Sequence, residues 1–392
     1  MDNINKWDMH EDVEYLHDWL DQARNLAIDI RTQAQKQGGL AIFTISTTVK
    51  MQENGHPFLT PMRRIIHGFI GGAVVSSQTQ AILLCKRIDG MVDHILVDAE
   101  KKIGITFGSD ENTLKHFGLE PLPRKDNARV QVEMGNLSAA CEPHIKKSHF
   151  QEYKPNDLTV ESVWHFLSNS YATLGGKRIA IIGCGNIGFK LALKLVESGS
   201  HVELARRDLW RGMHMADAIN IVKPESTIAI AHYNPNPTQA SLFCDAIVGC
   251  TDGTPVITWK MIQSMKPDGI VIDVGKGCIF KDAVKQAVEH EIPIIRCDIT
   301  SAIDGLISTI QRTQIIMGQE MGRLEIMEGI FIVSGGFLGL VGDIVVDNYR
   351  SPHRIIGIAD GRGDIKTKLS QKEHERLMIL GRKIKQVETR QV

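Results

Sequence analysis

The sequence predicts an α/β protein with a doubly wound parallel sheet at its centre, preceded by a smaller N-terminal α/β domain and followed by a C-terminal returning segment. Three observations lead to this prediction. Six short apolar runs lie between residues 178 and 299, mostly about 20–25 residues apart. Helical or turn segments separate these runs, as each return to a parallel strand requires. A glycine-rich turn directly follows the first run.

Residues 1–155 are expected to form the N-terminal domain. Apolar residues recur at three- and four-residue steps over 11–37 and stop at a glycine pair, which indicates an amphipathic helix. The run LAIFTIS at 40–46 is typical of a buried strand. Further along we expect a helix at 79–88, a strand at 92–100 and a short helix at 112–118.

A polar stretch with two prolines at 142–157 predicts the connector between domains. A helix is expected at 158–174, and the second domain, residues 156–310, then alternates strands with helices or turns. Its expected strands are 178–183, 201–205, 227–233, 245–251, 269–275 and 293–299.

The alternation breaks after Ser301, and residues 311–392 are expected to form a third part. This segment is predicted to pack back on the N-terminal domain or to form a subunit interface. Its expected elements are a helical stretch at 302–328, a buried strand pair or packed helix at 330–346, a strand at 354–360 and an amphipathic helix at 370–386.

The composition excludes several classes of protein. With 43% hydrophobic and 23% charged residues, the 392-residue chain is neither disordered nor fibrous. Its net charge of −1 gives no electrostatic reason to bind nucleic acid or an anionic membrane. We therefore expect a small-molecule partner, and a homodimer is the default assembly for a chain of this class.

The cysteines and the N-terminus indicate a cytoplasmic protein. Seven scattered cysteines with no C-x-x-C pair are typical of reduced thiols. The first residues lack the order of a secretory signal, and the apolar tract at 330–346 is shorter than the roughly 20 residues of a membrane span. The histidines show no metal-ligand spacing, so no metal is predicted.

The pattern G-x-G-x-x-G lies between the first central strand and the helix after it. Its first glycine allows a tight turn, the second lets the backbone approach a pyrophosphate, and the third lets the helix pack on the sheet. The pattern predicts a Rossmann domain that binds a dinucleotide; the alternative is such a domain that binds another nucleotide or none. The residues of the turn expected to hold the cofactor are Gly183, Gly185, Asn186, Ile187 and Gly188.

The end of the second central strand distinguishes the cofactors. An acid there accepts hydrogen bonds from the ribose of NAD, whereas an arginine pairs with the 2′-phosphate of NADP. This strand ends in Arg206 and Arg207, with Glu203 inside the strand and Asp208 beyond it. The sequence therefore favours NADP, with NAD as the alternative. A second alternative is that both arginines are solvated surface residues with no role in cofactor binding.

Later turns reach the same edge of the sheet and are expected to lie against the nicotinamide side of the cofactor. They place Cys250, Thr251, Val274 and Gly275 among the candidate binding residues. Lys276 is the only positively charged residue in these turns. It is therefore a candidate for polarising a carbonyl group or exchanging a proton; the alternative is a surface lysine without a catalytic role.

Residues 144–277 resemble the cofactor half of S-adenosylhomocysteine hydrolase. The segment from Lys147 to Phe150, Lys-Ser-His-Phe, is similar to the Lys-Ser-Lys-Phe of that family, and MKPDGIVIDVGKG is similar to its MKDDAIVCNIGH. The resemblance implies a catalytic role for Lys147. The chain departs from the family at Gln151-Glu152, at Arg206 and at Lys276, so we carry over the architecture and Lys147 but not the hydrolase reaction.

The same segment resembles methylene-tetrahydrofolate dehydrogenases and shikimate dehydrogenases, which share the L-x-G-K entry into the sheet and an arginine after the second strand. The resemblance implies NADP-linked hydride transfer, usually with a lysine from the N-terminal domain. Lys50, in STTVK, is a candidate for that lysine; a solvated loop lysine is the alternative.

Three hypotheses follow. The first is an NADP-dependent oxidoreductase, a dehydrogenase or reductase, of a small polar metabolite in the interdomain cleft, with Lys147 or Lys276 moving the proton. The second is a hydrolase or lyase that uses tightly bound NAD as an internal oxidant. The third is a nucleotide sensor without chemistry of its own.

Overall fold

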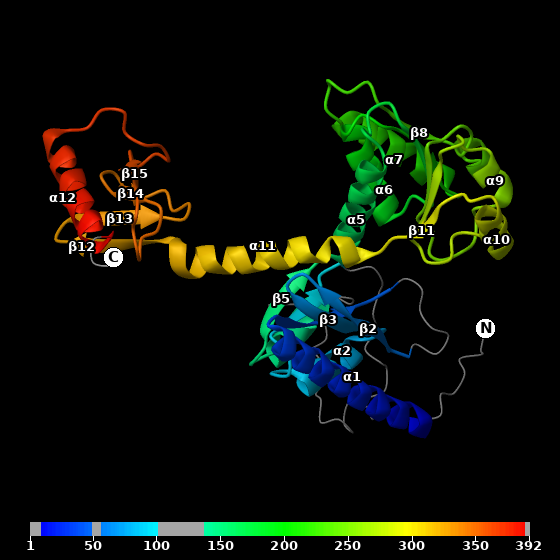
Figure 1. Ribbon diagram of the computed structural model, residues 1–392, viewed down its shortest axis with the longest axis horizontal. Coiled ribbons are helices and arrows are strands. Elements are labelled where there is room, and N and C mark those ends of the chain that lie inside the picture. The colour runs from blue at the N-terminus through cyan, green and yellow to red at the C-terminus, as the bar shows by residue number, and fades with distance from the viewer. Residues whose placement is uncertain (1–8, 49–55, 101–136, 389–392) are drawn as a thin grey trace, which may run out of the picture. The chain divides into compact units, whose positions relative to one another are not determined.

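The computed structural model describes residues 9–48, 56–100 and 137–388. The chain divides into two compact units, Met1–Asp304 and Gly305–Val392. Within the described residues the first unit contains two sheets and the second contains one, and Figure 1 labels many of their elements.

The first sheet has the strand order β2-β3-β1-β4-β5. Its strands are parallel except β2, which pairs with β3 in an antiparallel hairpin that the sequence patterns did not identify. The elements of this part are α1 (Met9–Gln37), β1 (Leu40–Ser46), β2 (Phe58–Ile65), β3 (Gly68–Val74), α2 (Gln78–Ile88), β4 (His94–Asp98), α4 (Leu137–Cys141), η1 (Glu142–His144) and β5 (His149–Tyr153).

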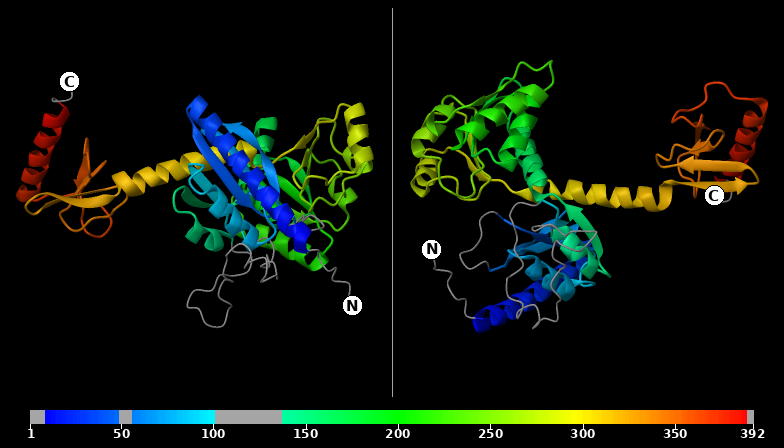
Figure 2. Two further views of the ribbon diagram at one scale, coloured as in Figure 1. Left: turned by 90° about the horizontal axis from the view of Figure 1, so that it is seen from below. Right: turned by 180° about the vertical axis from the view of Figure 1, so that it is seen from behind.

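The long helix α1 covers one face of this sheet, as Figure 2 shows. Its small and branched residues Ala23, Ala27 and Ile30, spaced three and four apart, are completely buried against the sheet. The expected helix at 112–118 lies outside the described residues.

The connector expected at 142–157 is corrected by the structure. Residues His149–Tyr153 form the edge strand β5, which runs parallel to β4 with Ile95 opposite Phe150. An edge strand has a neighbour on one side only, which explains its polar composition. The following helix α5 (Pro155–Ser170) begins at a proline, earlier than predicted.

The second sheet has the order β11-β10-β9-β6-β7-β8 and is wholly parallel. This confirms the predicted α/β fold with a doubly wound sheet. Each expected strand is present, although β8, β9, β10 and β11 are shorter than predicted. The elements are β6 (Arg178–Ile182), α6 (Asn186–Glu197), β7 (His201–Ala205), α7 (Leu209–Val222), β8 (Ala231–Tyr233), α8 (Pro237–Ala240), β9 (Ala246–Gly249), α9 (Trp259–Gln263), β10 (Ile270–Asp273), α10 (Lys281–Glu289), β11 (Ile294–Arg296) and η2 (Ile299–Ser301).

Two apolar cores cover the two faces of this sheet. One includes Leu167 of α5, Leu195 of α6 and Ile219 of α7. The other includes Met261 of α9 and residues of α10. Helices on both faces explain why the strands read as continuous apolar runs rather than as alternating patterns. From β6 the chain builds the sheet outward in one direction through β7 and β8 and then in the other through β9, β10 and β11. Sheets of this kind bind ligands where the direction changes, which here is between β6 and β9.

The second unit has its own sheet, in the order β12-β13-β14-β15, and its own core, which includes Ile332, Ile344 and Leu380. The helix predicted over 302–328 ends earlier, and residues 322–327 are a strand. The elements from the end of the first unit onward are α11 (Ile303–Ile315), η3 (Ile316–Glu320), β12 (Gly322–Met327), β13 (Ile330–Ser334), β14 (Ile344–Val346), β15 (Ile355–Ile358) and α12 (Gln371–Glu388).

Candidate functional site

The glycine turn between β6 and α6 has the geometry of a phosphate cradle. Gly183 has φ +94°, and a Cβ there would lie 2.7 Å from the backbone nitrogen of Thr251. Gly188 is equally restricted, because its Cβ would lie 2.7 Å from the carbonyl oxygen of Gly183. A Cβ at Gly185 meets no atom within 4 Å, so the backbone of this residue faces open space at the first turn of α6.

The end of β7 presents arginines to the same space. The Arg206 guanidinium donates a hydrogen bond from Nη1 to the carbonyl oxygen of Cys184, and its backbone carbonyl accepts one from Tyr233 Oη at 2.9 Å. Arg207 is exposed. The acid of this strand, Glu203, is nearly buried and pairs with Arg178 and His232.

The turns after β9 and β10 complete the floor of the site. Gly275 lies so close to the Thr251 carbonyl that a side chain there would collide with it. The buried Asp273 carboxylate accepts hydrogen bonds from the backbone nitrogens of Gly277 and Cys278, which holds the second turn in place. Lys276 lies between these residues with φ +56° and an exposed side chain.

These turns border a cavity of about 1340 Å³ at the carboxyl ends of both sheets of the first unit. The wholly parallel sheet that contains β6 contributes the glycine turn, both arginines and the turns after β9 and β10. The N-terminal sheet contributes a wall rich in hydroxyl groups: Thr44, Ser46, Thr47, Thr48, Thr60 and Tyr153.

Three of these residues, Thr44, Thr47 and Tyr153, are buried. Thr47 is 5% exposed, and among the described residues its Oγ1 has no hydrogen-bond partner. Tyr153 is 3% exposed, and burial, reinforced by the nearby Asp98 carboxylate, raises its pKa well above the usual value. Tyr153 therefore stays a neutral hydroxyl at any physiological pH and serves as a hydrogen-bonding group, not as a phenolate.

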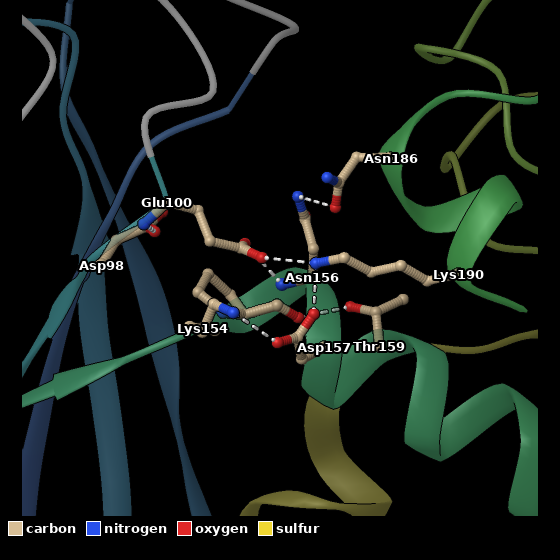
Figure 3. Close-up of polar contacts among 9 residues, drawn as sticks. Asp98, Glu100, Lys154, Asn156, Asp157, Thr159, Asn186 and Lys190 are labelled. Atoms are coloured by element: carbon tan, nitrogen blue, oxygen red, sulfur yellow. Dashed lines mark hydrogen bonds and ion pairs between the residues drawn. The ribbon is translucent and has the colours of Figure 1, made fainter. Parts of the chain in front are cut away.

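A polar cluster connects the two sheets at one side of the cavity, and Figure 3 shows it. Lys190 of α6 pairs with Glu100, which follows β4, with 3.5 Å between Nζ and Oε1, and also with Asp157 of α5. Asn156 Nδ2 donates to Asn186 Oδ1 at 3.2 Å. Burial opposes ionisation of Asp157, but hydrogen bonds from Lys190 and Lys154 outweigh it and lower its pKa.

The predicted cofactor residues gather in one place. Gly188 does not line the cavity and instead allows α6 to pack on β6. The predicted residues that line it are Gly183, Gly185, Asn186, Ile187, Arg206, Arg207, Cys250, Thr251, Val274 and Gly275.

The candidate catalytic lysines are placed differently from one another. Lys276 lines the cavity. Lys147 lies just before β5, at the opposite end of that strand from Tyr153; its side chain is exposed, and its backbone nitrogen donates to Asp89 Oδ1 at 3.0 Å. It is not among the residues that line the cavity. Lys50 lies outside the described residues.

Sequence patterns did not identify Lys190, Glu100, Thr47 or Tyr153. The one local signal was the position of Lys190, four residues after Asn186 and therefore on the same side of α6. The other three lie at or just after the carboxyl ends of β1, β4 and β5, which are far apart in the chain, and only the pairing of these strands brings them together.

The thiols near the glycine turn are not poised as nucleophiles. Burial raises the pKa of Cys184 to about 11, although Arg206 opposes the shift. Burial likewise raises the pKa of Cys250 well above its usual value. Both therefore remain protonated at neutral pH.

Residues 9–48, 56–100 and 137–388 hold no group of three or more His, Cys, Asp or Glu side chains arranged to bind a metal ion. Within the same ranges, no helix has both the length and the apolar character that crossing a membrane requires.

Comparisons with solved structures find distant likenesses. One of the subunits of dipicolinate synthase from Bacillus halodurans is 13% identical, with a TM-score of 0.31, 64% of this chain covered and 69% of that one. Phosphoglycerate oxidoreductase from Vibrio cholerae is 13% identical, with a TM-score of 0.32 and coverage of 66% and 82%. Shikimate dehydrogenase from Aquifex aeolicus is 17% identical, with a TM-score of 0.28 and coverage of 38% and 50%.

Among curated proteins, no relative matches the chain. Residues 178–276 match the model of a family described as NADP oxidoreductase, coenzyme F420-dependent. The matched segment begins at β6 and ends in the turn after β10, so it contains the glycine turn and both arginines. This part of the chain is the nucleotide-binding domain of an NAD(P)-dependent oxidoreductase.

Proposed function

We propose that the protein is an NADP-dependent dehydrogenase or reductase that acts on a small polar metabolite in the cavity of its first unit. The observation that carries the proposal is the composition of the cavity. A phosphate cradle and two arginines lie on one side, and a row of hydroxyl groups lies on the other. The first side suits a dinucleotide, and the second suits a substrate recognised by neutral hydrogen bonds.

The choice of NADP rests on the end of β7. An acid is needed there to bind the free 2′-hydroxyl of NAD. Glu203, the acid of this strand, is already paired with Arg178 and His232. Arg207 is exposed at the rim of the cavity and is available to a 2′-phosphate, for which an arginine fork is the best protein ligand.

When bound, NADP(H) would supply or accept a hydride. The backbone around Gly185 would hold the pyrophosphate at the N-terminus of α6. The hydroxyl groups of Thr47 and Tyr153 would orient the oxygen atoms of the substrate. A proton must accompany the hydride, and Lys276 is one candidate for moving it.

The alternative of a hydrolase or lyase with a built-in NAD depends on Lys147. The exposed position of that lysine, away from the cavity lining, gives the alternative no support. A nucleotide sensor would use the same cradle without turnover, so activity separates it from the proposed enzyme.

The proposal is tested in two steps. The purified protein is first titrated with NADPH and with NADH, and any co-purifying nucleotide is identified after denaturation. It is then incubated with NADPH or NADP⁺ and a panel of small oxo and hydroxy compounds while the absorbance of the reduced nucleotide is followed. We expect preferential binding of NADPH and nucleotide turnover with at least one compound. Binding of neither nucleotide, or an NAD that survives gel filtration, would contradict the proposal.

The arginine prediction is tested separately. Arg207→Gln is expected to weaken NADPH binding by about tenfold or more, because a charge-assisted hydrogen bond contributes about 1.5–3 kcal/mol, and to leave NADH binding unchanged. Arg211→Gln is the matched control, since Arg211 is exposed on α7, pairs with Asp208 and does not line the cavity. Equal losses for NADPH and NADH would show that Arg207 does not recognise the 2′-phosphate.

A further inference from the structure

Lys190 occupies an unusual position on the helix that begins at the glycine turn. It lines the cavity, and its ammonium lies between two carboxylates from different parts of the fold, Glu100 and Asp157 (Figure 3). The side chain is about one-third exposed, so it is held by ion pairs and yet open to the cavity.

The carboxylates that hold Lys190 are themselves fixed. Glu100 Oε2 accepts a hydrogen bond from the backbone nitrogen of Asn156 at 2.8 Å, and the Glu100 backbone nitrogen donates to Asp98 Oδ1 at 2.8 Å. Asp157 also pairs with Lys154 at 3.1 Å. This network fixes the direction of the Lys190 ammonium, which is what a positioned acid–base group requires.

The next lysine on α6 shows that an ion pair alone does not explain this placement. Lys194, one turn further along, pairs with Glu161 of α5 and has a similarly exposed side chain. Its ammonium lies 4.8 Å from the centre of the Trp164 ring, and Lys194 does not line the cavity. Both lysines form ion pairs with acids of other elements, but of the two only Lys190 lines the cavity.

The hydroxyl groups on the wall formed by the N-terminal sheet indicate what that part of the cavity receives. Thr47 Oγ1 is buried and, within the described part of the chain, has no hydrogen-bond partner. A buried hydroxyl without a partner is unfavourable unless a ligand or a water satisfies it. The oxygen atom of a substrate would supply that partner.

We infer that Lys190 is a catalytic residue of the proposed oxidoreductase, that it exchanges the proton of the substrate oxygen, and that the substrate is an aldehyde or ketone interconverted with its alcohol. In reduction, the carbonyl carbon would accept the hydride that the bound nucleotide supplies, and the π-electron pair would move to the oxygen. That oxygen would take a proton from Lys190 Nζ, and the neutral amine would be reprotonated from the solvent, so that each turnover consumes one solvent proton. Oxidation of the alcohol follows the same steps in reverse.

The inference rests on the proposed function and has a test that needs no substrate. Oxidised nicotinamide is a cation and reduced nicotinamide is neutral, so an ammonium beside the ring weakens NADP⁺ binding relative to NADPH. For an ammonium about 6 Å from the ring, one unit charge in an effective dielectric of about 40–80 would change this ratio about threefold to tenfold. Lys190→Met is therefore expected to lower the ratio of the NADP⁺ and NADPH dissociation constants by that factor.

Matched variants isolate the effect. Lys190→Arg keeps the charge and should keep the ratio, and Lys194→Met removes a charge one turn away and should also keep it. Lys190→Gln serves as a second neutral variant, and far-UV circular dichroism confirms folding of each protein. If Lys190→Met and Lys190→Gln leave the ratio unchanged, or shift it no more than Lys194→Met, the inference is wrong. If the wild-type protein binds neither nucleotide, the proposed function itself fails.

Turnover gives a second readout with any compound that the substrate panel identifies. Both Lys190→Met and Lys190→Arg should lower kcat by about 10²–10⁴-fold, because a guanidinium does not release its proton. Full activity of Lys190→Arg would reduce Lys190 to a source of charge and overturn its role in proton transfer.

Discussion

Gly185→Ala separates nucleotide binding from folding more cleanly than any other change in the glycine turn. Gly185 has φ −101°, which any residue adopts, and a Cβ there would meet no protein atom within 4 Å. The added methyl group would project into the open space where the pyrophosphate is expected. The protein should therefore fold normally and bind the nucleotide poorly.

The expected magnitudes follow from this geometry. Replacing glycine by alanine at a compatible backbone position changes the free energy of unfolding by less than about 1 kcal/mol, usually in the stabilising direction. Displacing the phosphate from the backbone removes at least one charge-assisted hydrogen bond, which contributes about 1.5–3 kcal/mol. The NADPH dissociation constant should rise by about 10- to 100-fold.

Gly188→Ala is the control with the opposite behaviour. Its Cβ would lie 2.7 Å from the Gly183 carbonyl oxygen and 3.2 Å from Ile181 Cγ2, both in the packed contact between α6 and β6. Overpacking of this kind costs about 1–3 kcal/mol of stability. Urea unfolding followed by circular dichroism measures this loss, and NADPH fluorescence titration measures affinity.

Wild-type affinity of Gly185→Ala for NADPH would contradict this prediction. A loss of stability in Gly185→Ala as large as that in Gly188→Ala would also contradict it, because the open space at Gly185 would then not exist in solution.

Two further predictions concern buried carboxylates. Asp245, 6% exposed, accepts hydrogen bonds from the Arg178 backbone nitrogen and from Lys266 Nζ, both at 2.8 Å; these outweigh the opposing effect of burial and lower its pKa. Because the pKa of Asp245 is lower in the folded than in the unfolded protein, its charge stabilises the fold above the unfolded pKa of about 3.9, and this stability is lost as pH falls through the folded pKa. Asp245→Asn should therefore lower the free energy of unfolding by about 1–3 kcal/mol at pH 7. Urea titrations at several pH values should also show that the stability of this variant depends less on acid pH. In the second unit, Asp343 accepts two hydrogen bonds from Arg323, at 2.7 and 2.9 Å. Asp343→Asn should speed proteolytic cleavage in the loop at 336–342, and an unchanged cleavage rate would mean that the pair does not hold this loop.

The doubly wound sheet was predictable from the chain because its signals are local. Strands buried on both faces read as apolar runs, and a strand, a glycine turn and a helix follow one another within residues 178–197. The cofactor turn and the arginines after β7 were accessible for the same reason. The edge strand β5 and the strand β12 were not, since one has a polar composition and the other follows a helix without a marked break.

The sequence alone determined the glycine turn of the proposed nucleotide cradle and the arginines after β7, because each pattern consists of residues close together in the chain. Only the tertiary structure decided which groups face that cradle. Glu100 and Lys190 are ninety positions apart in the sequence and meet because two separate sheets direct their carboxyl ends toward one cavity. The same geometry leaves Lys147 at the other end of its strand. Which polar residues form a site depends on how deeply they are buried and how close they lie in space. Both depend on the packing of segments that are remote in the sequence, so a local sequence pattern does not reveal them.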